Sequence, residues 1–178
     1  MSAAAERVTV SEDGTVRIIR SPKRKRSVSA RMVKGVLELR IPSWMGRAEE
    51  GKWVAEMQGR FARKKTSDSV DLDERCVALA RRFDLPTPTS VRWVTNQNGR
   101  WGSCTPADRA IRISDRLAGL PTWVLDYVLV HEMCHLRHSN HGLAFWTMVN
   151  RYPRTERARG YLMAIGIGEG SDDSDPAE

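Results

Sequence analysis

The 178-residue chain contains only three cysteines, Cys76, Cys104 and Cys134. They are odd in number, widely spaced and without a CxxC pair, which argues against a disulfide framework and fits a reducing compartment. No apolar run reaches the roughly 18 residues that a membrane-spanning helix requires. The first ten residues also lack the continuous apolar core of a signal peptide. We therefore expect a cytoplasmic protein with no membrane attachment.

Acidic residues are concentrated at the C-terminus. Residues 169–178 carry five acids and no base, so a chain of net charge +7 has +12 outside this tail. We expect the tail to be disordered. A basic body is typical of proteins that contact nucleic acid, although a solvated basic surface explains it equally well. The stretch SPKRKR fits either interpretation, together with its basic neighbours Arg17, Arg20, Arg31 and Arg40.

Residues 1–42 are predicted to form an N-terminal region of β-strands. RVTV and TVRIIR flank a turn at EDG, and alternate well enough for a hairpin. SVSARMV and GVLELRIP resemble a second hairpin that turns at Lys34 and Gly35, and Pro42 closes the region. These strands are expected to precede the main domain as an appendage.

A helix is predicted over residues 43–65, with Ser43 as its N-cap. Trp53, Met57 and Phe61 recur at i, i+4 and i+8, so they share one apolar face. We place the start of the main domain, residues 43–168, at this helix.

The rest of the main domain mixes helices with a few short strands. A second helix is predicted from about residue 68 to 83, followed by strands SVRWVT, RWGSC and AIRIS as a small meander. Three helical segments follow: WVLDYVLV with the residues after it, LAFWTMVNRY and TERARGYLMAI. This succession predicts an α+β fold.

Histidine is scarce, and all four histidines lie within residues 131–141. His131, Glu132 and His135 form an HExxH pattern on a predicted helix. Residues four apart lie on one face of a helix, so both imidazoles can reach one metal ion. A glutamate beside the first ligand is placed to take a proton from metal-bound water. The pattern therefore predicts a catalytic metal site.

A catalytic zinc ion typically needs a third protein ligand, for which we predict His141. This requires the helix to stop after about His138 and the chain to turn back, with Asn140 free to adopt a left-handed conformation. His138 and Glu156 are the alternative third ligands. Cys134 is either a buried thiol or a further, structural ligand.

The segment HEMCHLRHSNHGLAFW resembles the signature of the YgjP-like metallopeptidase family. The upstream RWGSCTPADRAIRISDRL and LDYVLVHE are similar to that family's WGSC block and to the segment before its zinc helix. The N-terminal strands with SPKRKR are also similar to its start. The resemblance covers nearly the whole chain except the acidic tail, and is most specific from Arg100 to Trp146.

The resemblance implies a small zincin-like domain with an HExxH active-site helix and a short antiparallel sheet. It implies one Zn²⁺ per chain on His131, His135 and His141, with Glu132 as the general base. It also implies a relation to SprT-like proteases, which act on proteins crosslinked to DNA. The expected substrate is a protein or peptide.

The strand RWGSC is a candidate substrate-binding strand, since an exposed strand edge can pair with an extended peptide. This assigns Trp101, Gly102, Ser103 and Cys104 to substrate binding, with a core strand as the alternative. Arg100 is a candidate for stabilising a transition-state oxyanion. The tryptophans that flank the site are expected to pack in the core, with a peptide-binding surface as the alternative: Trp93, Trp101, Trp123 and Trp146.

The leading hypothesis is a zinc-dependent metalloendopeptidase, in which a zinc-activated water attacks the peptide bond. The alternative is a non-catalytic, zinc-stabilised module that binds nucleic acid or protein, which would require four protein ligands. A metal hydrolase with another substrate is a third interpretation. Glu132 favours an enzyme, because a structural zinc has no use for a carboxylate beside it. The oligomeric state stays open.

Overall fold

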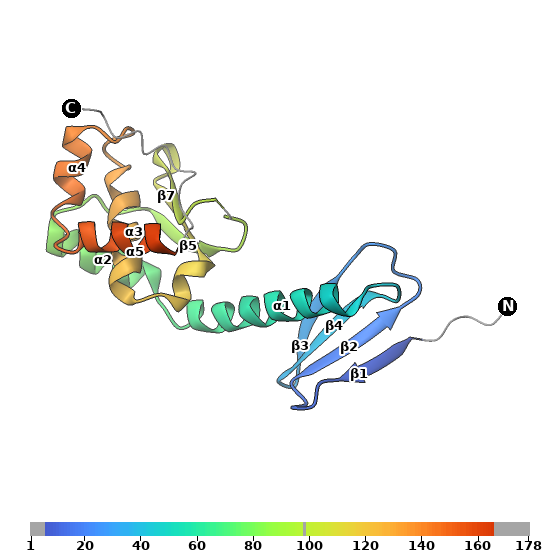
Figure 1. The fold of residues 1–178 in the computed structure, drawn as a ribbon. Coiled ribbons are helices and arrows are strands. Elements are labelled where there is room, and N and C mark those ends of the chain that lie inside the picture. The colour runs from blue at the N-terminus through green and yellow to red at the C-terminus, as the bar shows by residue number, and fades with distance from the viewer. Residues whose placement is uncertain (1–5, 98, 166–178) are drawn as a thin grey trace. The chain divides into compact units, whose positions relative to one another are not determined.

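The computed structural model describes residues 6–97 and 99–165. The chain divides into two compact units, Met1–Ala62 and Arg63–Glu178 (Figure 1). Helices and short sheets combine with N-terminal strands that precede the main domain, which confirms the predicted α+β class. The domain boundary predicted at residue 42 stays a prediction, and the predicted acidic tail lies outside the described residues.

The N-terminal unit is built on a four-stranded sheet of order β1-β2-β4-β3. Both predicted hairpins are confirmed, since β1 pairs with β2 and β3 with β4 in antiparallel fashion. The second hairpin turns at Lys34 and Gly35, which have φ angles of 49° and 82°. Parallel pairing of β2 with β4 joins the hairpins into one sheet. The strands are β1 (Arg7–Val10), β2 (Val16–Ser21), β3 (Ser29–Val33) and β4 (Val36–Pro42).

Helix α1 (Arg47–Ser67) begins four residues later than predicted, so the assignment of Ser43 as its N-cap is wrong. Residues 43–46 lie outside regular secondary structure. The Arg20 guanidinium donates to the backbone carbonyls of Ser43 and Met45 and pairs with Glu50. The segment before the helix is therefore bound to the sheet by its carbonyls. A local N-cap signal does not include this long-range contact.

The face of α1 predicted from the i, i+4, i+8 spacing is the face that packs in the N-terminal unit. Met57 is buried with Leu39 and Ile41 of β4, and Trp53 and Phe61 pack against this cluster. Burial of these side chains removes apolar surface from water, which stabilises the fold by about 25 cal/mol per Å². The first part of α1 therefore completes the core of the sheet.

The second unit holds the remaining helices and a three-stranded sheet. Asp71 caps α2, its side chain accepting a hydrogen bond from the Glu74 N–H at 2.9 Å. The helices are α2 (Leu72–Phe83), α3 (Thr122–Cys134), α4 (Leu143–Val149) and α5 (Thr155–Ala164). The strands are β5 (Ser90–Val94), β6 (Gly102–Thr105) and β7 (Ala110–Ser114), with 3₁₀ helices at Pro106–Asp108 and Asp115–Gly119.

The predicted meander of the three strands is wrong. The sheet order is β5-β7-β6, with β7 parallel to β5 and antiparallel to β6. Ile111 and Ile113 of β7 are 1% and 0% exposed, so the most apolar strand takes the centre. Strand β6 consequently lies at an edge, and β7 is its only partner among the described strands.

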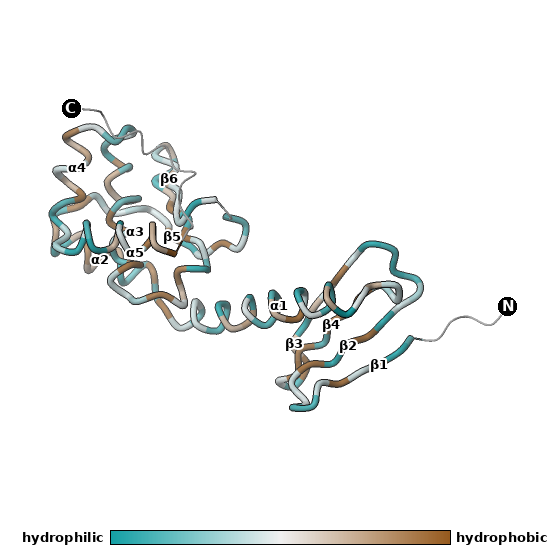
Figure 2. The backbone as a smooth tube through the Cα atoms, in the orientation of Figure 1, coloured by the Kyte–Doolittle hydropathy of each residue, from teal (hydrophilic) through white to brown (hydrophobic). Residues whose placement is uncertain are grey.

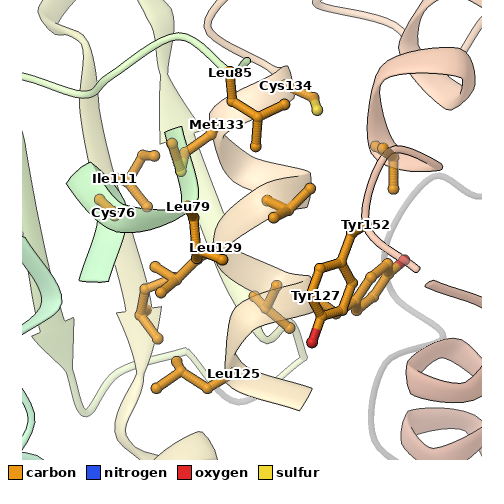
Figure 3. Packing of buried hydrophobic residues seen from close by; sticks show 14 of the residues in the cluster. Cys76, Leu79, Leu85, Ile111, Leu125, Tyr127, Leu129, Met133, Cys134 and Tyr152 are labelled. Atoms are coloured by element: carbon orange, nitrogen blue, oxygen red, sulfur yellow. The ribbon is translucent and has the colours of Figure 1, made fainter. Parts of the chain in front are cut away.

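Helix α3 is the buried centre of this unit. Nine of its thirteen residues are buried, including Leu125, Leu129 and Met133. Figure 3 shows Leu129 and Met133 in one cluster with Leu79 of α2 and Ile111 of β7. Close packing on several sides fixes the helix, and with it the side chains at its C-terminal end.

Candidate metal centre

Helix α3 carries the HExxH segment at its C-terminal end. The helix ends at Cys134, earlier than predicted, and His135 is its C-cap. His131 and His135 are thus one helical turn apart, in the arrangement that the spacing predicts. The His135 N–H still bonds to the His131 carbonyl, at 3.4 Å.

The chain turns back between α3 and α4 and brings His141 to the other two histidines. The predicted left-handed conformation of Asn140 is wrong, because the non-glycine residues with positive φ in the described chain are Lys34, Asp84 and Arg109. Instead, the N–H groups of Arg137 and His138 both bond to the Cys134 carbonyl, at 3.0 Å. A tight turn therefore follows α3 directly, without a left-handed residue.

The Nε2 atoms of His131, His135 and His141 form a triangle with sides of 3.1, 3.2 and 3.2 Å. A tetrahedral zinc with bonds of about 2.0–2.1 Å would separate its ligand nitrogens by about 3.3–3.4 Å. Three imidazole nitrogens cannot all hydrogen-bond to one another, since a protonated ring nitrogen has no lone pair to accept with. A metal cation fits this donor set.

The ring of His135 is oriented by the backbone of His138. Its Nδ1 lies 3.0 Å from the His138 carbonyl oxygen. A carbonyl only accepts, so Nδ1 carries the proton and Nε2 keeps its lone pair for a metal. Burial holds the pKa of His131 well below its usual range, and the neighbouring His135 and His141 lower that pKa further. A neutral imidazole is the form that ligates metals.

Aromatic rings from α4 surround the histidines. The Phe145 ring is fully buried, and its centroid lies 4.5–4.9 Å from those of all three imidazoles. Trp146 stacks on His141 at 5.8 Å with an interplanar angle of 29°. The Arg159 guanidinium lies 4.7 Å from the Trp146 ring centroid. These contacts restrict the imidazole rotamers.

Glu132 directly follows His131 in α3 and is buried, at 6% exposure. Burial raises the pKa of its carboxyl to about 8, and the positive charge of Arg100 opposes this rise. A Cβ atom added to Gly102 would lie 2.5 Å from Glu132 Oε1 and 2.8 Å from its Cγ. Strand β6 therefore approaches the Glu132 side chain at a position that only glycine allows.

The structure places the other predicted substrate residues on or beside β6. Trp101 is 8% exposed, with the Arg116 guanidinium 4.9 Å from its ring centroid. Ser103 Oγ accepts a hydrogen bond from Gln97 Nε2 at 2.6 Å. Cys104 is half-buried, and burial together with the Glu132 charge raises its pKa to about 11.

The alternative ligands lie outside the triangle. Within the described residues, one group of three or more His, Cys, Asp or Glu side chains is close enough together to hold a metal ion. Its members are His131, His135 and His141. Cys134 is buried in the apolar core, and its pKa is raised to about 12. Glu156 is exposed and pairs with Arg159 at 3.3 Å.

Comparison with known proteins agrees with this geometry. The sequence model of the YgjP-like family, metallopeptidase domain, matches residues 47–164. The chain belongs to the YgjP-like metallopeptidase family. The predicted family, the zincin-like fold class and the predicted enzyme class, a metallopeptidase and therefore a hydrolase, are confirmed by this membership.

Among solved structures, the crystal structure of the metallopeptidase zymogen of Pyrococcus abyssi abylysin is similar to this chain. The superposition covers 55% of this chain and 98% of the abylysin chain, at 18% sequence identity and a TM-score of 0.48. None of the curated proteins matches the sequence. In the described part of the chain, no helix has the length and apolarity needed to cross a membrane.

Two features of this metallopeptidase site were missed from the sequence. Phe145 and Trp146 contact the histidine rings, whereas the sequence predicts core packing for Trp146, with a peptide-binding surface as the alternative. Phe145 stands four residues after His141, but His141 lies before the N-cap of α4, so helical periodicity does not reveal this contact. Gly102 was assigned to substrate binding, and its approach to Glu132 has no local signal, because the two residues are brought together by the fold.

Proposed function

We propose that the chain is a zinc-dependent endopeptidase that holds one Zn²⁺ per chain on His131, His135 and His141. The observation that carries the proposal is the triangle of three Nε2 atoms, 3.1–3.2 Å apart, beside a buried glutamate. Imidazole ligands suit zinc and similar transition metals better than magnesium or calcium. With three protein ligands, a tetrahedral ion keeps one position free for catalysis.

Glu132 is the proposed general base. A bound zinc ion supplies Lewis-acid chemistry, which lowers the pKa of water and polarises a carbonyl group. A carboxylate oxygen of Glu132 takes the proton of the attacking water and later transfers it to the leaving amine. Its position supports this role, since it follows the first ligand directly and is shielded from solvent. Arg100 is proposed to stabilise the oxyanion, because its charge acts on Glu132.

Strand β6 is proposed to bind the substrate. It lies at the edge of its sheet, so one side of its backbone has no strand partner in the described chain. Such an edge pairs with an extended peptide through main-chain hydrogen bonds. Gly102 at its start contacts Glu132, which would place a peptide bond near the base. Trp101, Ser103 and Cys104 complete the proposed binding strand.

The alternative, a structural zinc module, finds less support. A closed structural site needs four protein ligands. The described cluster offers three ligands. His138 contacts the His135 imidazole through its backbone carbonyl and not through its ring. A buried carboxylate beside the cluster also serves no structural purpose.

The test combines metal content with peptide hydrolysis. We expect one zinc per wild-type chain by mass spectrometry, largely lost in His141→Ala and retained in the control His138→Ala. Glu132→Gln should keep the zinc and lower the rate of hydrolysis of an unstructured protein such as casein by about 10²–10⁴-fold. A wild type without metal in zinc-replete buffer, or an active Glu132→Gln, would refute the proposal.

A further inference from the structure

The positive charge of the chain is densest in the N-terminal unit. Residues 1–62 contain thirteen basic and seven acidic residues, a net charge of +6. Residues 63–168 also have a net charge of +6, from sixteen basic and ten acidic residues, but they spread it over a longer stretch, and the acidic residues 169–178 bring the chain to +7. The N-terminal unit therefore carries more positive charge per residue than the part of the chain with the candidate metal centre.

One face of the N-terminal sheet is open and rich in arginine. Leu37, Leu39 and Ile41 of β4 point to the face that α1 covers, so the alternate residues Glu38 and Arg40 point to the other. Glu38 pairs in register with Arg17 of β2 on one side and with Arg31 of β3 on the other, so all three side chains share this face. Arg31 and Arg40 pair with Glu38 at 2.7 and 3.3 Å, and Arg17 has no ion pair within the described chain. Three arginines with one carboxylate leave the face positive.

The loop between β2 and β3 continues this basic surface beyond the ends of the central strands. It is drawn as a hydrophilic segment in Figure 2. Lys23, Lys25 and Arg26 are exposed, and none forms an ion pair with a described carboxylate. Arg24 instead shapes the loop, donating to the Ser27 carbonyl at 3.3 Å and to its Oγ at 3.1 Å. The loop thus holds three free cations in an ordered turn.

Trp44 lies beside this loop and is 62% exposed. Its indole N–H donates to the Lys25 carbonyl at 3.0 Å, which ties the ring to the basic loop. Trp44 is the one large apolar side chain that is exposed within the described residues 22–27 and 43–47. An exposed indole held by a hydrogen bond among cations can stack on a flat ligand.

We propose that the residues 22–27 loop and Trp44 form a binding site for single-stranded nucleic acid. Lys23, Lys25 and Arg26 neutralise backbone phosphates, and an unpaired base stacks on Trp44. The arginines of the open sheet face extend the positive surface. A lipid surface fits less well, because membrane-binding segments bury several large apolar side chains and this region exposes one.

The first test measures binding of the full-length protein to a fluorescein-labelled dT₂₀ oligonucleotide by anisotropy, over a range of salt concentrations. We expect the logarithm of the association constant to fall with the logarithm of salt concentration, by about 0.7 per phosphate contacted. The triple variant Lys23→Gln, Lys25→Gln, Arg26→Gln should lower this slope by about 2. Its matched control removes three exposed cations of α1, Lys52→Gln, Arg60→Gln and Lys65→Gln, and should leave the slope within about 0.5 of wild type. Melting curves establish that each variant is folded.

The second test separates stacking from simple apolar contact at Trp44. Trp44→Leu should weaken oligonucleotide binding about tenfold, and Trp44→Phe should restore most of it, because base stacking requires an aromatic face. Sedimentation with phosphatidylserine vesicles tests the lipid alternative, for which Trp44→Leu would bind as well as wild type. The proposal is overturned by salt-independent binding, by equal loss in the control triple variant, or by binding to vesicles without binding to dT₂₀. It stands apart from the peptidase proposal, since none of these residues lies at the metal centre.

Discussion

Gly102 of β6 stands against the side chain of Glu132 of α3, with room for a hydrogen atom and not for a methyl group. The contact involves Cγ, Cδ and Oε1 of the glutamate, at 2.8, 2.9 and 2.5 Å from an added Cβ. Real Cβ atoms do not approach other atoms this closely, so a side chain at position 102 must move the carboxylate. The position of the proposed base is therefore set by a strand that is remote in sequence.

The first prediction concerns this contact. Gly102→Ala should lower kcat for peptide hydrolysis by at least about tenfold, since a small displacement of a catalytic group is costly. Zinc content should stay at the wild-type level, because the three imidazoles are not displaced. Steady-state kinetics and metal analysis of one preparation check both statements.

Truncation of the glutamate provides the control for Gly102→Ala. Glu132→Ala removes Cγ, Cδ and Oε1, the three atoms that an added Cβ would meet, so Gly102→Ala should cost less free energy of unfolding in this background than in wild type. Equal losses in the two backgrounds, or full activity of Gly102→Ala, would show that the contact does not position the base.

The second prediction concerns Phe145, which is fully buried among the three imidazoles. Phe145→Ala should destabilise the protein by about 3–5 kcal/mol and weaken zinc binding, because the rings lose the surface that restricts them. Phe145→Leu keeps most of the volume and should cost less. Thermal unfolding and competition with a fluorescent zinc chelator measure the two effects. Unchanged zinc affinity in a folded Phe145→Ala would contradict the packing argument.

The third prediction concerns metal removal. The proposed zinc ligands come from the C-terminal end of α3 and from the turn that precedes α4, so an ion should stabilise the native fold over the unfolded chain. At free zinc 1,000-fold above the dissociation constant, the stabilisation is about 4 kcal/mol. Adding EDTA should therefore lower Tm by several degrees in wild type and have little effect on His141→Ala. An EDTA shift of the same size in both proteins would place the stabilising ion elsewhere.

The fourth prediction concerns pH and the turn between β1 and β2. Hydrogen bonds from the Ser11 and Thr15 side chains and the Thr15 N–H lower the pKa of Asp13 from 3.8 to about 2. A carboxyl whose pKa is lower in the folded state stabilises the fold above pH 3.8 and loses this effect as the pH falls toward 2. NMR titration of the Asp13 carboxyl should give a midpoint of about 2. In the variant Ser11→Ala, Thr15→Val the midpoint should return toward 3.8, and an unchanged midpoint would refute the assignment.

The sequence was most informative where the determining contacts are local. The turn at Lys34 and Gly35 and the one-turn spacing of His131 and His135 depend on neighbours within a few residues. His141 was also predicted, because a third ligand must be near in a chain that has so few histidines. These features could be deduced from spacing and from residue chemistry.

The sequence-based predictions are wrong where the structure depends on contacts between residues far apart in the chain. Strand β7 takes the centre of its sheet because Ile111 and Ile113 are buried there, and no turn signal reveals that order. Helix α1 starts late because Arg20, far back in the chain, binds the carbonyls of the preceding segment. The contact between Gly102 and Glu132 belongs to the same class, since it exists only after β6 and α3 have packed together.

The packing of Met57 has a practical consequence for dissecting the protein. The family match begins at residue 47, yet α1 residues up to Phe61 complete the core of the N-terminal sheet. A fragment trimmed to the matched region would carry α1 with its apolar stripe of Trp53, Met57 and Phe61 exposed to water. Such a stripe promotes aggregation. Recombinant expression of the peptidase alone should therefore start after Ala62, where the compact units divide.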